Sequence, residues 1–245
     1  NKSVELEPLS KDGSGGYRVR TRKTTGFFRR SRGLTFAAKD VFLAAGTLGT
    51  NHLLLNMKRR GTMPNLPPHL GRFTRTNSET LLGVRSLDPE ADFSKGVAIM
   101  SSVHPDEVTH IEPVRFGSGH DAMSVLVAAL TDGGGRAPRF LRWIGRELRH
   151  PLLHLRLRNP AGWARQTIIL LVMQTLENSF RLKLRRPWPW PFGRTLGAAS
   201  ESGGRMPTWI PPGNDFGRRL AQRAGGVAAN IISETTLNIP ITAHI

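Results

Sequence analysis

The sequence predicts an α+β fold, in which strands of an antiparallel or mixed sheet alternate with a few helices. Four segments of the sequence support this class. Residues 180–185 alternate strictly between apolar and basic side chains, and residues 167–174 form an apolar run of the length of one buried strand. Residues 137–148 instead repeat apolar side chains at helical spacing. Residues 41–55 join a short apolar run to a leucine-rich segment, as expected for a strand followed by a helix.

The N-terminal residues 1–48 are predicted to be β-structured. Residues 17–21 alternate as a strand does, and a basic turn region follows over residues 22–33. Residues 34–46 are apolar enough to form the next strand. A small sheet is therefore expected ahead of the first helix.

A small-residue turn links the end of that sheet to the first helix. The expected strand ends in Ala44, Ala45 and Gly46, which leave room for a ligand to approach the backbone. Thr50 is expected to cap the helix, and Gly61 is placed to end it. The N–H groups at the start of a helix favour an anion. This turn therefore has the features of a nucleotide-binding crossover.

The middle of the chain is predicted to contain loops and short strands. Prolines in residues 62–96 forbid long regular structure there. Strands are expected at residues 97–102, 108–114 and 123–130.

A basic amphipathic helix is expected over about residues 137–148, with Pro151 after it. Its apolar stripe is predicted to consist of Phe140, Trp143, Ile144 and Leu148. Its arginines are predicted to lie off that stripe, namely Arg139, Arg142, Arg146 and Arg149.

The C-terminal third is predicted to begin with a hairpin of two strands, residues 167–174 and 180–185. Residues 187–212 are irregular by composition, and a helix is expected at 213–224.

The net charge of +17 is the strongest compositional feature. Eleven arginines and one lysine lie between Arg136 and Arg186, against only Glu147 and Glu177. Such a segment can bind a polyanion, either nucleic acid or an acidic membrane surface. Its arginines can equally serve only to keep the protein surface soluble. No nucleic-acid-binding motif accompanies the charge, which argues against nucleic acid. The absence of cysteine excludes disulfides and thiolate metal sites, and no metal site is expected.

Several motifs occur in an order that matches one enzyme family. The segment VFLAAGTLGTNHLLL at residues 41–55 is preceded by the KDG turn and the YRVR strand, and followed by GTMPNL and RTNSE. The last residues are ITAHI. Together they resemble the FAD-dependent glucose–methanol–choline (GMC) oxidoreductases, in particular the cholesterol oxidase branch.

The resemblance implies a domain organisation and a cofactor. Residues 1–80 would be part of a Rossmann-like FAD-binding domain, residues 81–238 an inserted substrate-binding sheet domain, and residues 239–245 a return to the FAD-binding domain. Ala44, Ala45 and Gly46 would line the adenosine-diphosphate part of FAD. The backbone of Val4 would contact the adenine, and Asn77 would lie near the flavin ring.

The resemblance also implies two catalytic residues. His244 matches the family's motif histidine, which would orient the substrate hydroxyl and take its proton as hydride leaves carbon. Glu112 is the nearest match to the glutamate that moves a proton in the Δ5-to-Δ4 shift of cholesterol oxidases. Pro113 directly after it departs from the family's pattern, and Glu177 is the reserve candidate.

The expected function is therefore that of a piece of an oxidoreductase that oxidises a sterol 3β-hydroxyl by hydride transfer to flavin. The G-x-G-x-x-G turn and the family's Asn-Pro segment are absent from these residues. The isolated chain is accordingly expected to hold FAD poorly and to be inactive. Residues 137–158 are expected to touch a membrane surface, with Arg139, Arg142 and Arg146 on the headgroups. The alternative is a basic, non-enzymatic module that binds nucleic acid or membrane, and a GMC enzyme for another alcohol also stays open.

Overall fold

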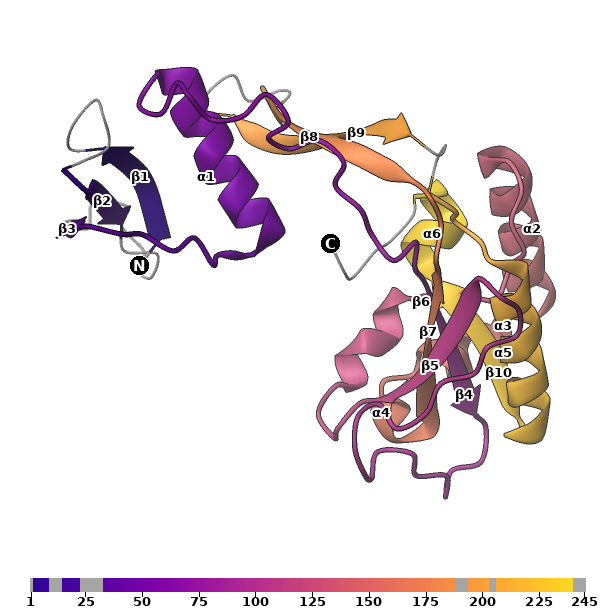
Figure 1. Ribbon diagram of the computed structural model, residues 1–245. Coiled ribbons are helices and arrows are strands. Elements are labelled where there is room, and N and C mark those ends of the chain that lie inside the picture. Colours follow the sequence, from indigo (N-terminus) through magenta and orange to yellow (C-terminus); the bar gives the residue numbers. More distant parts are fainter. Residues whose placement is uncertain (1, 9–14, 23–32, 188–193, 203–205, 240–245) are drawn as a thin grey trace. The chain divides into compact units, whose positions relative to one another are not determined.

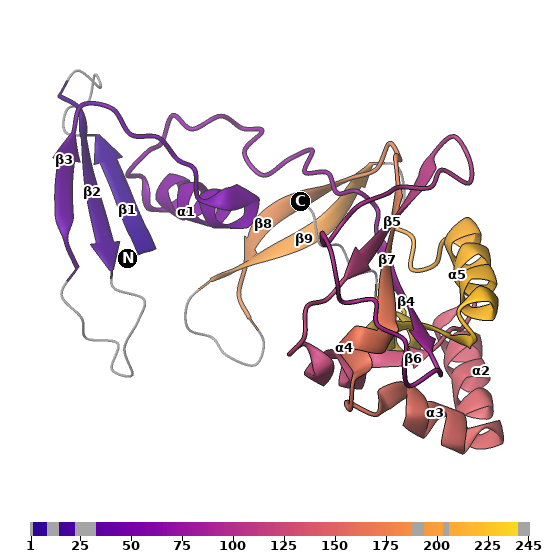
Figure 2. The same cartoon turned by 90° about the horizontal axis from the view of Figure 1, so that it is seen from below.

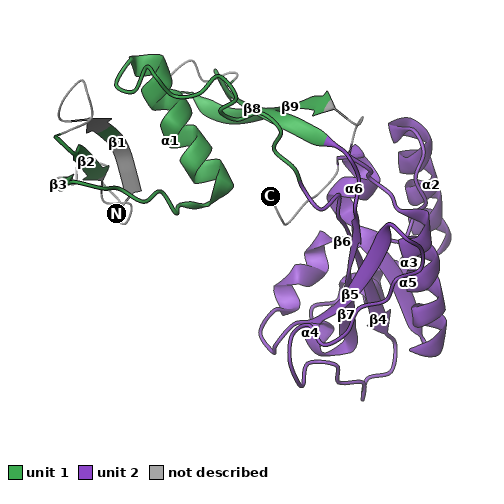
Figure 3. Ribbon diagram, in the orientation of Figure 1, with its two compact units in different colours: residues 1–75, 179–204 green, residues 76–178, 205–245 purple. Residues whose placement is uncertain are grey.

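The computed structural model describes residues 2–8, 15–22, 33–187, 194–202 and 206–239 (Figure 1). Two compact units make up the chain (Figure 3). Unit 1 consists of residues 1–75 and 179–204, and unit 2 of residues 76–178 and 205–245. Both combine helices with antiparallel strands, which confirms the α+β class. The expected domain boundaries stay a prediction.

Unit 1 contains a three-stranded antiparallel sheet, one long helix and a two-stranded ribbon. Its elements are β1 (Lys2–Pro8), β2 (Tyr17–Arg22), β3 (Thr35–Ala38), α1 (Gly46–Arg60), β8 (Ser179–Arg185) and β9 (Thr195–Ser202). The helix α1 packs against β1, β8 and β9, and its Met57 is 1% exposed. The strand order in the sheet is β1-β2-β3.

Three predictions for unit 1 need correction. The strand expected over residues 34–46 is only the short β3, and residues 41–43 have no regular structure, with Phe42 93% exposed. The helix begins at Gly46, so Thr50 lies inside it and is not the cap. The strand β8 pairs with β9 and not with residues 167–174, the strand before it in the chain, because those residues belong to unit 2 and β8 belongs to unit 1. The end of α1 at Gly61 is confirmed by its φ of 77°.

Unit 2 is built on a five-stranded antiparallel sheet in the order β5-β7-β4-β10-β6 (Figures 1 and 2). Its strands are β4 (Thr80–Ser86), β5 (Thr109–Arg115), β6 (Val127–Ala129), β7 (Thr167–Gln174) and β10 (Gly226–Ile231). Its helices are the 3₁₀-helix η1 (Asp121–Leu126), α2 (Arg136–Arg149), α3 (Pro151–Arg158), α4 (Trp163–Gln166), α5 (Pro211–Arg223) and α6 (Ile232–Leu237).

Side chains alternate between the two faces of this sheet and form two apolar clusters. One face packs against α5 and includes Leu82, Val84, Ile111, Leu170 and Val172. The other face packs against η1, α3 and α4 through Val127, Leu157, Trp163, Ala164 and Ala229. This second face contains the candidate site.

The strands β5 and β7 of unit 2 lie where the sequence predicts them, whereas β4 and β10 are not predicted. The strand β4 lies within residues 62–96, which the prolines marked as loop, and β10 directly follows the expected helix. Within residues 97–102 only Ile99 forms an isolated bridge to β5. Of the strand expected at 123–130, residues 123–126 belong to the 3₁₀-helix η1 and residues 127–129 form β6. Short buried strands carry little local signal, since their partners come from distant parts of the chain.

The helix α2 forms where expected, but its buried face differs from the predicted stripe. Arg139 is fully buried and donates hydrogen bonds to the carbonyls of Thr208 (2.8 Å) and Thr131 (3.3 Å). Leu148, predicted to be on the apolar stripe, is 77% exposed. Burial lowers the pKa of the Arg139 guanidinium, and the charge of Glu234 opposes that effect. Among the described residues, no helix is long and apolar enough to cross a bilayer.

Candidate functional site

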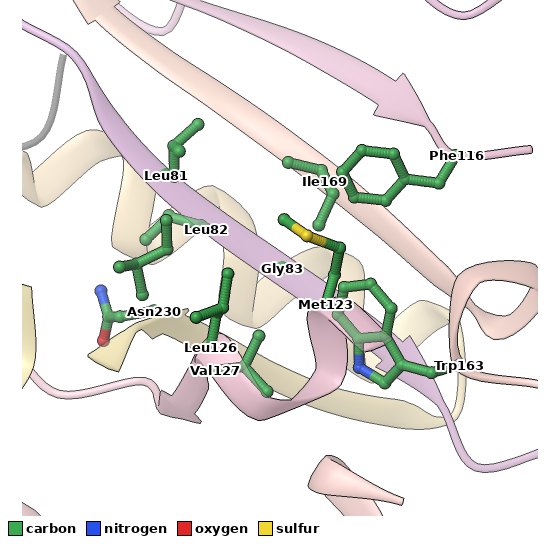
Figure 4. Close-up of a pocket in the computed structure, with 11 residues that line it drawn as sticks. Leu81, Leu82, Gly83, Phe116, Met123, Leu126, Val127, Trp163, Ile169 and Asn230 are labelled. Carbon is green, nitrogen blue, oxygen red and sulfur yellow. The ribbon is translucent and has the colours of Figure 1, made fainter. Parts of the chain in front are cut away.

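The candidate site is an apolar cavity of about 60 Å³ on the face of the unit 2 sheet opposite α5. The strands supply its floor, and η1, α4 and the segment after β5 supply its walls. Figure 4 shows the side chains arranged around the strand at Gly83. The lining residues are Leu81, Leu82, Gly83, Phe116, Met123, Leu126, Val127, Trp163, Ile169, Asn230 and Ile231.

Gly83 leaves the floor of the cavity without a side chain. It lies opposite Ile169 on β7 and Ala229 on β10, so the three residues form one row across the sheet. A Cβ on Gly83 would lie 3.6 Å from Ile169 Cδ1, an ordinary contact, and its backbone has no positive φ. A larger side chain at this position would therefore project into the cavity without straining the strand.

Trp163 forms a wall of the cavity and is almost fully buried, at 1% exposure. Its ring lies 6.2 Å from that of Phe116. Within the described part of the chain, the indole Nε1 has no hydrogen-bond partner. Trp163 therefore contributes a buried, rigid aromatic surface to the cavity.

Glu112 lies on the same face of the sheet as the cavity. On β5 it is opposite Leu171, which is itself opposite Leu81 of the cavity floor. Residues directly opposite each other in an antiparallel pair point to the same face. The next residue on that face of β5, Val114, is opposite Ile169. Glu112 therefore lies on β5, separated by the single strand β7 from Leu81 on β4, which lines the cavity.

Glu112 is half-buried, and its carboxylate makes no hydrogen bond or ion pair among the described residues. A carboxylate that no described side chain engages, on the same side of the sheet as the cavity, is a candidate for proton transfer. Pro113 fits because β5 is at the edge of the sheet. Ile111 exchanges backbone hydrogen bonds with Val103 on the outer side, so the missing N–H of Pro113 also faces away from β7.

Asn77 lies in a turn that side chains hold in one conformation. Its Nδ2 donates to Glu79 Oε2 at 3.1 Å, and its carbonyl accepts from the backbone of Gln174 at 3.0 Å. Ser78 has a φ of 46°, uncommon for a residue with a side chain, and its N–H donates to Thr76 Oγ1. Such strain is concentrated at functional sites in proteins.

The small residues of unit 1 lie at the start of α1. Ala44, Ala45 and Gly46 are all exposed, and nothing lies within 4 Å of a Cβ built on Gly46. The first N–H groups of a helix have no partner inside it and attract anions. This open approach fits the diphosphate of a nucleotide cofactor.

Val4 occupies an irregular position in β1. The register passes from Ser3 opposite Thr21 to Glu5 opposite Arg20, so Val4 is the extra residue of a β-bulge. A bulge interrupts the ladder of backbone hydrogen bonds. A backbone contact from Val4 to a ligand is compatible with this geometry.

Two catalytic candidates remain, His244 and Glu177. His244 lies outside the described residues. Glu177 is exposed in the turn between β7 and β8. No cluster of three or more potential metal ligands occurs in the part of the chain that the structure describes.

The cavity itself, including Gly83, Met123, Phe116 and Trp163, is not predicted from the sequence. Its only local signal is a glycine inside an apolar run, Leu81-Leu82-Gly83-Val84, which marks a close approach in a strand. The walls come from distant parts of the sequence, and no local pattern links them.

Two curated relatives match nearly the whole chain. A cholesterol oxidase of Acinetobacter baumannii is 40% identical over 245 residues, which is 99% of this chain and 43% of the relative. A cholesterol oxidase of Mycobacterium tuberculosis (strain H37Rv) is 43% identical over 237 residues, which is 94% of this chain and 40% of the relative. The chain is homologous to cholesterol oxidases. It spans about two fifths of their length. No family model matches it.

Proposed function

We propose that this chain forms the substrate-binding sheet and one cofactor-contacting segment of an FAD-dependent oxidoreductase that oxidises the 3β-hydroxyl of a sterol. The observation that carries the proposal is the identity of 40–43% to two cholesterol oxidases over 94–99% of the chain. That match also favours an enzyme over a basic binding module without activity.

Unit 1 would contact FAD through backbone groups. Ala44, Ala45 and Gly46 at the start of α1 are exposed and small, which fits the adenosine-diphosphate portion. The bulge at Val4 would present its backbone to the adenine. In this proposal residues 1–80 correspond to part of a Rossmann-like domain, and Asn77, at the start of unit 2, lies near the flavin ring. When bound, FAD supplies the acceptor for a hydride.

Unit 2 would bind the sterol. The cavity is apolar, and at about 60 Å³ it has room for a small aliphatic group. It would therefore hold one end of the sterol, while the remaining rings lie along the apolar face of the sheet toward Glu112. Dispersion and hydrophobic contacts with Met123, Phe116 and Ile169 would supply most of the affinity.

Two side chains would move protons. His244 would accept the hydroxyl proton as hydride leaves the carbinol carbon. Glu112 would then take a proton from C4 of the 3-keto product and return it to C6, which shifts the double bond with no net gain or loss of protons. A half-buried carboxylate without a described partner is suited to this exchange.

Sterol binding tests the cavity without any need for turnover. Dehydroergosterol, a fluorescent sterol, should accept energy from tryptophan, including Trp163, when it is mixed with the chain. Gly83→Leu should fill the cavity and weaken binding roughly tenfold or more, as expected for lost apolar burial. Gly117→Leu is the matched control, because Gly117 is exposed and no atom lies within 4 Å of a Cβ built on it. Equal binding by Gly83→Leu and wild type would contradict the cavity assignment.

Activity requires the complete reading frame from which this sequence comes. There, wild type should convert cholesterol to a Δ4-3-ketone, and His244→Asn should slow oxidation by roughly 10²–10⁴-fold. Glu112→Gln should oxidise but accumulate the Δ5-3-ketone. Absence of flavin from the complete protein would refute the proposal.

A further inference from the structure

A histidine lies next to Glu112 at the edge of the unit 2 sheet. The strand β5 forms that edge, and on it His110 precedes Glu112 by two residues. Alternate residues of a strand point to the same face, so the Cα atoms of this pair lie side by side at roughly 6.5 Å. His110 is opposite Met173 and Glu112 is opposite Leu171 on the neighbouring strand β7. An imidazole therefore adjoins Glu112 on the face of the sheet that holds the cavity.

A second histidine holds the ring of His110. His104 belongs to the segment on the outer side of β5, where Val103 and Ile111 exchange backbone hydrogen bonds of 2.9 and 2.8 Å. This register puts His104 opposite His110, and their rings stack with centroids 5.7 Å apart and 26° between the planes. His104 Nε2 in turn lies 3.2 Å from Ser102 Oγ. Ring stacking thus orients His110 without using either of its nitrogens.

Both ring nitrogens of His110 are available for proton transfer. Neither makes a hydrogen bond or ion pair within the described part of the chain, and His110 is only half-buried, so water reaches it. An imidazole accepts a proton at one nitrogen and donates one from the other, which makes histidine a proton shuttle. Across the spacing between His110 and Glu112, one bridging water is enough to connect the imidazole to the carboxylate.

A metal ion is the other ligand that two histidines beside a carboxylate suggest. No group of three or more potential metal ligands comes together among the residues that the structure describes. Asp106, two residues after His104, accepts instead from the backbone N–H groups of Val108 at 3.0 Å and Thr109 at 2.6 Å. Proton exchange with Glu112 is therefore the use that fits this stacked pair.

We propose that His110 acts through Glu112, as the relay that exchanges the proton held by that carboxyl group with solvent. The inference rests on the proposed function, in which Glu112 removes a proton from C4 of the 3-keto product and returns one to C6. Between these two steps the O–H of Glu112 passes its proton through the bridging water to His110, and a solvent proton returns by the same route. One proton leaves and one arrives, so the carboxyl group is unchanged, and no oxidant or reductant takes part.

Deuterium labelling of the isomerisation step tests the relay in the protein made from the complete reading frame. The Δ5-3-ketone is supplied directly in D₂O, which bypasses oxidation, and NMR measures deuterium at C6 of the Δ4-3-ketone after subtraction of the reaction without enzyme. Wild type should place solvent deuterium at C6. His110→Phe keeps an aromatic ring against His104 and should lower the deuterium content roughly fivefold or more, while the rate of isomerisation stays within about threefold of wild type.

Two further variants separate the relay from packing. His110→Gln keeps a hydrogen-bonding side chain that cannot pass a proton as imidazole does, so it should lose the label as His110→Phe does. His120→Phe is the matched control, because it removes an imidazole that also stacks on an aromatic ring, that of Phe116 at 5.3 Å, and it should keep the wild-type label. Equal labelling in wild type and His110→Phe, a label kept by His110→Gln, or an equal loss in His120→Phe would each overturn the relay.

The role of Glu112 is measured separately in the same assay. Glu112→Gln should slow isomerisation of the Δ5-3-ketone by roughly 10²-fold or more. A wild type that does not isomerise, or a Glu112→Gln variant as fast as wild type, would refute the role proposed for Glu112 and the relay with it. Isomerisation that depends on Glu112, together with an unchanged label in His110→Phe, would overturn the relay alone.

Discussion

Unit 1 and unit 2 bury their apolar residues to very different extents. Among the described residues, sixteen buried apolar side chains belong to unit 2 and four to unit 1, namely Leu6, Met57, Phe180 and Leu182. Unit 1 instead exposes Leu34, Phe36, Phe42 and Leu48 to 48–93%. Unit 2 closes its own core between helices and sheet, whereas the described part of unit 1 leaves large apolar side chains at its surface. The buried apolar core of the described residues is thus concentrated in unit 2.

The largest expected effect is the loss of stability when one core side chain of unit 2 is removed. Leu170 is 0% exposed between β4, β5 and α5. Leu170→Ala should lower the free energy of unfolding of unit 2 by about 3 kcal/mol through lost burial and the cavity left behind. Hydrogen exchange should then accelerate in β4, β7 and β10 but not in β1–β3. Leu141→Ala, the same change at an exposed position, should alter stability by less than about 0.5 kcal/mol. Similar losses in both variants would contradict the assigned core.

The next largest loss of stability is expected when the buried Arg85 is replaced. It is 6% exposed and donates to the carbonyls of Arg156, Leu157, Asn159 and Ala161 at the end of α3, and to Gln166. Arg85→Met should cost about 2–3 kcal/mol in urea unfolding, because these acceptors lose a charged donor.

Arg85→Lys is the matched variant for that position, since it keeps the charge but cannot reach all of these acceptors. It should recover part of the loss. Faster hydrogen exchange over residues 156–166 should accompany Arg85→Met, and unchanged exchange there would contradict the role of Arg85 in holding the wall that includes Trp163.

One glycine in each unit offers a smaller test. Gly61 ends α1 with a φ of 77° and has no atom within 4 Å of its Cβ position, so its effect is conformational alone. Gly61→Ala should destabilise unit 1 by about 1 kcal/mol. Gly145, exposed inside α2 and equally free of neighbours, is the control. Gly145→Ala should instead stabilise unit 2 by about 0.5–1 kcal/mol in thermal unfolding. A change in stability of the same sign in both variants would contradict the backbone conformations of Gly61 and Gly145.

Acid should destabilise both units slightly through one carboxylate each. In unit 1 the N–H of Phe73 (2.8 Å) and the side chain of Arg72 (2.5 Å) lower the pKa of Glu201. In unit 2, burial would raise the pKa of Asp132, but bonds from Arg218 and Asn214 outweigh it and lower that pKa.

The sign of the pH effect follows from those shifts. A lowered folded pKa contributes stability above the usual values of 4.5 for Glu201 and 3.8 for Asp132, and this is lost as the pH falls through the lowered values. Asp132→Asn should therefore flatten the decline in melting temperature of unit 2 below about pH 4, and Glu201→Gln that of unit 1. An unchanged pH profile in both variants would exclude these carboxylates as its source.

Local order along the chain is enough to predict several features of this protein. The apolar run of β7, the alternation of β8, the helices α2 and α5, and the end of α1 at Gly61 follow from patterns within a few residues. The resemblance to cholesterol oxidases also rests on short motifs in a fixed order, and the curated relatives confirm it.

Long-range packing instead sets which faces these elements bury. Arg139 lies inside and Leu148 outside because distant carbonyls at Thr208 and Thr131 receive the guanidinium. The strand β7 pairs with β4 and β5 instead of β8, and Gly83 and Trp163 meet around one cavity. Burial and strand pairing depend on contacts between residues far apart in the chain, and local side-chain periodicity does not encode those contacts.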